Sequence, residues 1–199
     1  MVPTMKKISM AIPMSIEPFQ CHTEIKDKLL KGISSSELVH NVTYLSDNTD
    51  ITKCDWNHAR EKDRDWVKIL LPSLTDHLSR WATAMGFKSF MIRDLWFQQY
   101  AEGSQHDWHT HGCNWTGVYF LDIPDNAEKT KFKDPMNTEI ENEFDVSEGD
   151  VLIFPSFVIH KAPKNNNQKM KTIISWNMET VLTPEEIHIE SQLASRPLY

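Results

Sequence analysis

The stretch that decides the fold is His106–Pro124, which reads HDWHTHGCNWTGVYFLDIP and passes from a histidine-rich run into a β-rich apolar run. Side chains on an extended strand alternate between its two faces, so His109 and His111 project the same way. Two imidazoles at this spacing can approach one metal ion, each through a ring nitrogen at roughly 2.1 Å. The pair alone is a weak signal, because histidines this close together also occur on solvated strands.

A divalent metal ion needs at least one further ligand, and His160 is the natural candidate because it ends the β-rich run DVLIFPSFVIH. Histidines from two distant strands can meet only if those strands close into a barrel-like sheet, so the pattern predicts the fold and the metal site together. Asp107 has the same strand parity as His109 and His111 and remains an alternative, carboxylate ligand. Asp107 or His106 could instead orient a ligand through a hydrogen bond.

The chain from Phe87 onward consists of short β-rich runs separated by turn residues such as Glu148-Gly149-Asp150. Runs at this spacing predict a β-sandwich or barrel, of which the jelly roll is one common form. No linker is visible before these runs. We therefore expect one β-rich (α+β) domain over residues 1–199, with helical support in about 1–86 and a β core in about 87–180.

The first half of the chain contains two expected helices. Apolar residues recur every three or four positions from Trp66 to Met85, which predicts an amphipathic helix that Pro72 bends or splits and Gly86 ends. A shorter helix is expected over residues 23–30, with Thr23 as its N-cap. Residues 34–57 are polar, and we expect a loop there with at most one short strand near residues 42–45.

The composition limits the class of protein. The 199 residues carry a net charge of -7, which disfavours nucleic acid as a partner. Three cysteines, Cys21, Cys54 and Cys113, are far apart and form no CxxC motif, so we expect a reduced, intracellular (cytoplasmic) protein. The amino terminus lacks the sustained apolar run of a signal peptide, and no segment is long enough to span a membrane.

Four motifs occur in order between about Trp96 and Asn177: WHTHGCNWTGVYFLDIP, FKDP, EGDVLIFPSFVIHKAP and KTIISWN. This series resembles the small branch of the 2-oxoglutarate/Fe(II)-dependent oxygenases. The resemblance implies a double-stranded β-helix, or jelly roll, with Fe(II) held at one end of the barrel. It also implies that O2 converts 2-oxoglutarate to succinate and CO2 while an organic substrate is hydroxylated.

The sequence departs from the superfamily at one ligand position. In the superfamily the two ligands on one strand are His-x-Asp or His-x-Glu. In this sequence His111 occupies the position of the carboxylate. The resemblance makes His109, His111 and His160 the iron ligands, and three neutral imidazoles leave the full charge of +2 on Fe(II). An aspartate would reduce this charge to +1.

The far carboxylate of 2-oxoglutarate needs a cation in a mostly apolar pocket. Lys171 is the first choice, because the family places an arginine or lysine at this position. The hydroxyl of Ser175 could share in binding the carboxylate. Lys169 has the same strand parity as Lys171 and is the competing candidate. Tyr100 and Tyr119 are candidates for a hydrogen bond to the cofactor. Asn177, at the end of the last motif, is a candidate for facing the iron chamber.

Two other functions stay open. A cupin-like protein with three histidine ligands would not need Lys171 or 2-oxoglutarate, and a metal-binding jelly roll could lack catalysis altogether. The substrate is expected to be a small molecule or a protein side chain, and the oligomeric state is not determined by the sequence. Hydrolase, nucleotide-binding and dithiol motifs (GxSxG, P-loop, GxGxxG and CxxC) do not occur in the chain.

Overall fold

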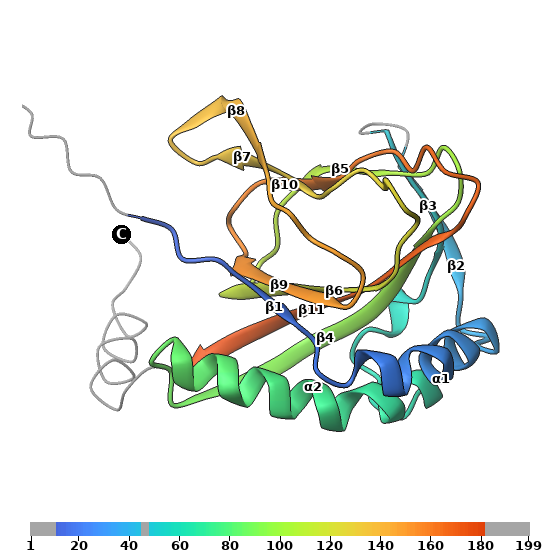
Figure 1. Cartoon of the computed structure of the whole chain (residues 1–199), viewed down its shortest axis with the longest axis horizontal. Helices are drawn as coiled ribbons and strands as arrows, with labels where there is room; N and C mark the ends of the chain where they lie inside the picture. Colours follow the sequence, from blue (N-terminus) through green and yellow to red (C-terminus); the bar gives the residue numbers. More distant parts are fainter. Residues whose placement is uncertain (1–10, 45–47, 182–199) are drawn as a thin grey trace, which may run out of the picture.

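The computed structural model describes residues 11–44 and 48–181 of the chain. Two β-sheets face each other, with two helices against the outer face of the larger sheet (Figure 1). The larger sheet has seven strands in the order β1-β9-β6-β11-β4-β3-β2, and the smaller has four in the order β5-β10-β7-β8. The β-rich fold with supporting helices is therefore confirmed.

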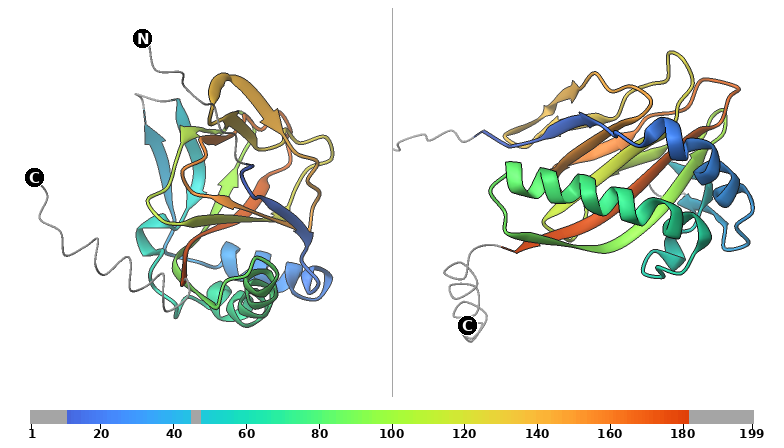
Figure 2. Two further views of the ribbon diagram at one scale, coloured as in Figure 1. Left: turned by 90° about the vertical axis from the view of Figure 1, so that its left-hand side faces the viewer. Right: turned by 60° about the horizontal axis from the view of Figure 1, so that its bottom comes forward.

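The strands of the larger sheet are β1 (Ser15–Pro18), β2 (His40–Tyr44), β3 (Thr49–Cys54), β4 (Ser89–Tyr100), β6 (Trp115–Asp122), β9 (Asp150–Pro155) and β11 (Lys171–Val181). Those of the smaller sheet are β5 (His106–His109), β7 (Lys131–Asp134), β8 (Asn137–Glu143) and β10 (His160–Ala162). The view along the strands shows the smaller sheet covering one face of the larger (Figure 2). Every named strand pairing within both sheets is antiparallel.

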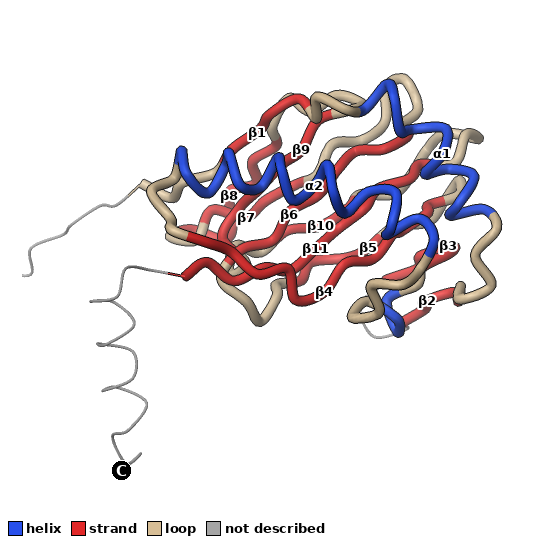
Figure 3. The backbone as a smooth tube through the Cα atoms, turned by 90° about the horizontal axis from the view of Figure 1, so that it is seen from below, coloured by secondary structure: helices blue, strands red, loops and turns tan. Residues whose placement is uncertain are grey.

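Helices α1 (His22–Ser34) and α2 (Asp65–Ala84) lie side by side across the larger sheet, as the view from below shows (Figure 3). Helix α1 differs from its expected boundaries, whereas α2 agrees within one residue and is followed by Gly86, whose φ is +83°. The carbonyl of Cys21 accepts the N–H of Ile25, so α1 begins before Thr23, which is not its N-cap. Pro72 lies inside α2 without splitting it, because the apolar stripe of this helix is held on the sheet along its whole length.

The segment expected to be a loop contains two strands. β2 and β3 form a hairpin, and β3 continues the sheet by pairing with β4. Their polar composition hides the alternation, since only Val42, Thr49, Ile51 and Cys54 of their described side chains are buried. The first half of the chain therefore contributes strands as well as helical support.

Two apolar cores lie on opposite faces of the larger sheet. One joins α1 and α2 to the sheet, and the other fills the space between the two sheets. Strands β6 and β11 are buried on both faces, which explains their continuous apolar runs. Among residues 11–44 and 48–181, neither helix is long and apolar enough to cross a lipid bilayer.

Gly117 on β6 is required by the first of these cores, which gives a prediction about stability. A Cβ atom at Gly117 would lie 2.1 Å from the indole ring of Trp176, its cross-strand partner on β11. Gly117→Ala should therefore lower the free energy of unfolding by about 1–3 kcal/mol, the usual cost of overpacking. Denaturant titration measures this, with Gly112→Ala as the control because an added Cβ there has no neighbour within 4 Å. Equal stability of the two variants would contradict the packing described.

Candidate metal centre and cofactor pocket

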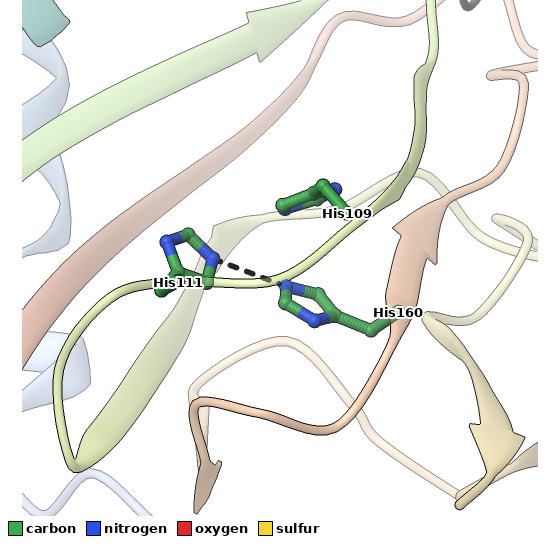
Figure 4. A group of neighbouring side chains, drawn as sticks. All are labelled: His109, His111 and His160. Atoms are coloured by element: carbon green, nitrogen blue, oxygen red, sulfur yellow. Dashed lines mark hydrogen bonds between the residues drawn. The ribbon is translucent and has the colours of Figure 1, made fainter. Parts of the chain in front are cut away.

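Three histidines from the smaller sheet and its adjoining loop converge on one point (Figure 4). His109 ends β5, His111 follows it, and His160 begins β10, where it is the register partner of His109. One ring nitrogen from each lies within 4.8 Å of the others, and the Nε2 atoms of His111 and His160 are 3.3 Å apart. The pairing of β5 with β10 brings His109 and His160 together, and the loop after β5 places His111 beside them.

Backbone carbonyls fix the orientation of two of these rings. Nδ1 of His109 lies 2.7 Å from the carbonyl oxygen of Asp107, and Nδ1 of His160 lies 2.9 Å from that of Val158. A carbonyl oxygen can only accept, so each Nδ1 carries the proton and donates. In the neutral ring the lone pair is then on Nε2, which is the arrangement usual for metal-binding histidines.

Burial keeps two of the three rings, those of His111 and His160, uncharged. Burial lowers the pKa of His160 well below its usual value and that of His111 to about 3, and the neighbouring imidazoles add to both effects. At neutral pH the two rings are therefore unprotonated and their lone pairs can coordinate a cation. Because a metal ion competes with protons for these nitrogens, low proton affinity at a convergent site favours metal binding.

Of the two residues next to the cluster, His106 contacts a ring of the cluster and Asp107 does not belong to it. The ring of His106 stacks on that of His109, with centroids 3.7 Å apart, and Gln98 Nε2 lies 3.4 Å from His106 Nδ1. His106 thus occupies a position that orients a ligand. The Asp107 carboxylate instead accepts the N–H of Trp108, and Asp107 is not one of the clustered residues. The structure does not bring the alternative carboxylate ligand to the site.

A small cavity of about 20 Å³ lies beside the histidines between the two sheets. Its walls include alternate residues of β4 (Trp96, Gln98, Tyr100) and of β11 (Ile173, Ser175). Sequence reasoning missed Gln98 as a wall residue, although its alternation with Tyr100 on one strand is the signal that could have identified it.

Two hydrogen-bond donors lie together on the cavity side of the larger sheet. Lys171 on β11 is the register partner of Tyr100 on β4, so both side chains share the face that lines the cavity. Lys171 is only 3% exposed, and its Nζ donates to the carbonyl oxygen of Glu128 at 3.1 Å. The buried hydroxyl of Tyr100 has no hydrogen-bond partner in the described part of the chain. An anionic group in the cavity could accept from both.

The competing lysine is placed differently. Lys169 is half-exposed and its Nζ pairs with Asp122 at 3.0 Å on the surface. Its ammonium therefore already has a carboxylate partner at the surface. Of the two lysines weighed from the sequence, only Lys171 is buried and is the cross-strand partner of a residue that lines the cavity.

The two remaining candidates for cofactor contacts have different outcomes. Ser175 lines the cavity, where its hydroxyl donates to Gln98 Oε1 at 3.2 Å. The side chain of Tyr119 instead belongs to the core between the larger sheet and the helices, and its hydroxyl lies 2.7 Å from Nδ1 of His22 on α1. Val118, its neighbour on β6, is the residue that faces the cavity. This placement corrects the expectation that Tyr119 contacts the cofactor.

No protein-family model and no curated protein matches the chain. Solved structures match its fold. A 2OG-Fe(II) oxygenase family oxidoreductase from Burkholderia pseudomallei has a TM-score of 0.66 at 12% identity, covering 83% of this chain and 84% of that one. A prolyl-4-hydroxylase from Pseudomonas putida has a TM-score of 0.60 at 12% identity, covering 84% and 93%.

A third similar structure is the viral collagen prolyl hydroxylase from Paramecium bursaria Chlorella virus-1 in its 2-oxoglutarate complex. The TM-score is 0.61 at 11% identity, covering 85% of this chain and 96% of the viral one. At such low identity these likenesses establish a shared fold only. What this chain does has to be argued from its own residues.

Proposed function

We propose that this chain is an Fe(II)- and 2-oxoglutarate-dependent dioxygenase that hydroxylates an organic substrate, with His109, His111 and His160 as the iron ligands. One observation carries the proposal. Three imidazoles, that of His160 buried and the other two partly buried, converge at one part of a cavity that Tyr100 also lines, and the buried Lys171 is the cross-strand partner of Tyr100. That combination suits a divalent metal and an anionic co-substrate in the same chamber.

The residues fit both groups. Imidazole nitrogens are good ligands for iron, and three protein ligands leave coordination positions open for other molecules. A buried ammonium is costly, and for Lys171 the structure gives one carbonyl contact, the longer-range attraction of the Glu128 carboxylate and no ion pair among the described residues. The far carboxylate of 2-oxoglutarate would supply a direct ion pair, and the Tyr100 hydroxyl would donate a second hydrogen bond to it.

In this reaction the protein would hold the metal and the co-substrate in place and shield them from water. When bound, iron and 2-oxoglutarate activate O2 and yield succinate, CO2 and an oxidised substrate. His106 and the carbonyls of Asp107 and Val158 keep the ligand rings in place. Ile173 and Val118 give the chamber apolar walls that limit the entry of water. We assign Ser175, through Gln98, to the support of this pocket.

The order of the strands supports a double-stranded β-helix. From β4 to β11 the chain passes repeatedly between the larger and the smaller sheet, and β5 and β10 carry the metal-binding residues. We place this jelly roll in one domain of residues 1–199, with the helices supporting it. We also propose a reduced cytoplasmic location, and a small molecule or a protein side chain as substrate.

The histidine at position 111 favours one second candidate. A cupin-like metalloprotein with three histidine ligands would use the same cluster without 2-oxoglutarate. A jelly roll that binds the metal without catalysis would also use this cluster. Neither requires a buried lysine at the cavity. Lys171 is therefore the residue that favours the oxygenase over both alternatives.

Turnover tests the proposal directly. Protein loaded anaerobically with Fe(II) and 2-oxoglutarate should consume O2 on exposure to air and release succinate in proportion, and omission of any one component should stop this release. Succinate is measured by chromatography and O2 by electrode in the same samples. Metal-loaded, folded protein that releases no succinate would reject the oxygenase and leave the two alternatives.

The ionisation of Lys171 predicts how cofactor binding depends on pH. Burial lowers the pKa of Lys171 to about 8 in the free protein. The protonated ammonium binds the carboxylate, so the Kd for 2-oxoglutarate should stay constant below pH 8 and rise above it, by up to roughly tenfold per pH unit. Calorimetric titration of Zn(II)-loaded protein across this range measures the effect. Lys171→Arg should remove the rise, and an unaltered pH profile in that variant would contradict the assignment.

A further inference from the structure

A second hollow lies beside the metal cavity, between the 3₁₀ turn η1 (Trp56–His58) and β4. Its volume is about 720 Å³, including its open mouth, and its lining includes Trp56, Arg60, Glu61 and Asp94. We call it the η1 hollow. The turn is fixed against β4 because the buried carboxylate of Asp55 accepts the N–H groups of Phe97 and of the Trp66 indole, both at 2.9 Å, as well as pairing with Arg64.

The η1 hollow adjoins the histidine cluster. The indole of Trp56 stacks on that of Trp96 with centroids 5.7 Å apart, and the Trp96 ring is 5.9 Å from that of His111. Trp96 lines the metal cavity, so the two tryptophans form a wall shared by the cavity and the η1 hollow. A molecule in the η1 hollow would therefore lie next to the metal-binding residues.

Asp94 connects the two spaces through the sheet register. Thr116, Asn177 and Asp94 are successive cross-strand partners on β6, β11 and β4, so their side chains share one face. Thr116 lines the metal cavity, which identifies this face as the inner one. Asn177 therefore shares the inner face of the sheet with Thr116, although it does not itself line the metal cavity, and Asp94 lies beside it.

The carboxylate of Asp94 accepts a hydrogen bond from Asn177 through one oxygen and forms an ion pair with Arg60 through the other. Asn177 Nδ2 donates to Asp94 Oδ2 at 3.2 Å, while Asn177 Oδ1 accepts from the buried Thr116 hydroxyl at 3.4 Å. Arg60 Nε donates to Asp94 Oδ1 at 3.1 Å. The Arg60 side chain is 79% exposed and that of Asp94 only 17%, so the ion pair depends on a solvated partner that another cation can replace at little cost.

The charge and shape of the η1 hollow suit a cation. Asp94 and Glu61 contribute two carboxylates and Arg60 one permanent positive charge, while Glu61 also contacts His58 at 2.8 Å. The indole of Trp56 adds an aromatic surface of the kind on which ammonium and guanidinium groups rest. Lys62 is not part of the lining, but its buried Nζ is near enough to Asp94 to be attracted by this carboxylate, so Asp94 is already partly neutralised by a second cation.

We infer that the η1 hollow binds a cationic nitrogen of the substrate, an ammonium or guanidinium group, through Asp94 in place of Arg60. The guanidinium of Arg60 already shows that such a group fits against this carboxylate. The carbon to be oxidised would lie a few bonds from the nitrogen, past the tryptophan wall and toward the three histidines. This inference rests on the proposed function, because it names the substrate class of that same site.

Matched pairs of probes test the inference. Blocked amino acids (N-acetyl, C-amide) carrying arginine or lysine are compared with their neutral counterparts, citrulline and 6-hydroxynorleucine. Binding to protein loaded with Zn(II) and 2-oxoglutarate is measured by calorimetry. Each cationic probe should bind at least about tenfold more tightly than its neutral counterpart, the ratio that one net charge-assisted hydrogen bond provides.

Three variants locate the effect. Asp94→Asn keeps the shape of the side chain and should remove the preference for the cationic probe, whereas Arg60→Gln removes the internal competitor and should tighten cationic probes several-fold. Asp145→Asn is the control, because this carboxylate pairs with Lys129 outside the η1 hollow and its loss should leave the ratio unchanged. Equal binding of cationic and neutral probes, or a ratio that survives Asp94→Asn, overturns the inference.

The two proposals fail in different ways. Succinate release without added probe, measured on the unaltered protein, reports the proposed oxygenase alone. Release that occurs while cationic and neutral probes bind alike would reject the cation site and keep the oxygenase. Absent release with a clear charge preference would reject the oxygenase and leave a cation-binding hollow beside a metal site.

Discussion

Replacing His160 with alanine should abolish tight metal binding, with an affinity loss larger than the roughly 10- to 100-fold typical of changes outside the coordination shell. His160 is 4% exposed and faces His109 across the β5–β10 pair. Its loss leaves only two protein ligands, which cannot enclose a divalent ion. Anaerobic titration with Fe(II), and with Zn(II) as a redox-inert probe, measures the affinity, and circular dichroism verifies that the variant is folded.

Two comparisons make this experiment specific. His40→Ala removes an imidazole from β2, outside the cluster, and should leave the metal affinity unchanged. His111→Asp installs the carboxylate usual at this position and should retain a bound metal with its charge reduced from +2 to +1, whereas His111→Ala should not. A folded His160→Ala protein that binds Fe(II) as tightly as the parent would show that the ligand set is wrong.

Replacing Lys171 with alanine should raise the 2-oxoglutarate concentration needed for half-saturation by about 10- to 100-fold, the loss of a buried charge-assisted pair. Metal binding should persist, because Lys171 is outside the histidine cluster. Half-saturation is measured by calorimetry on metal-loaded protein. The expectation follows from the 3% exposure of Lys171 and its position beside Tyr100 on the cavity face.

Lys169→Ala is the matched control for this prediction. Lys169 lies two residues earlier, is half-exposed and pairs with Asp122, so its removal should change half-saturation little. Lys171→Arg should recover much of the loss, since it restores the charge with a different geometry. An unchanged cofactor affinity in Lys171→Ala would refute the assignment of this lysine. A large loss of affinity in Lys169→Ala would instead identify Lys169 as the residue that binds the carboxylate.

The sequence was most informative where a strand pattern and a chemical requirement coincide. His109, His111 and His160 could be predicted because their spacing and the need for a third ligand leave few arrangements, although His111 lies in the loop after β5 and not on the strand itself. Tyr119 shows the limit of the same reasoning. The irregular turn before β6 breaks the parity, and Tyr119 faces α1 while Val118 faces the cavity.

Other features depend on contacts that no local pattern records. The β2–β3 hairpin is polar, and its place in the sheet depends on pairing with β4, a distant part of the chain. The η1 hollow likewise depends on the buried carboxylate of Asp55, which binds the backbone of β4. Long-range pairing of this kind is set by tertiary structure and not by propensity. The η1 hollow, where we propose that the substrate binds, could therefore not be predicted from the sequence.

The most direct measurement of the central claim is the visible absorption of the protein under anaerobic conditions with Fe(II) and 2-oxoglutarate. We expect a weak metal-to-ligand band in the green region that requires both additions and is absent in His160→Ala. Its half-saturating 2-oxoglutarate concentration should increase in Lys171→Ala. A folded protein that binds Zn(II) tightly but shows no such band at saturating Fe(II) and 2-oxoglutarate would contradict the account.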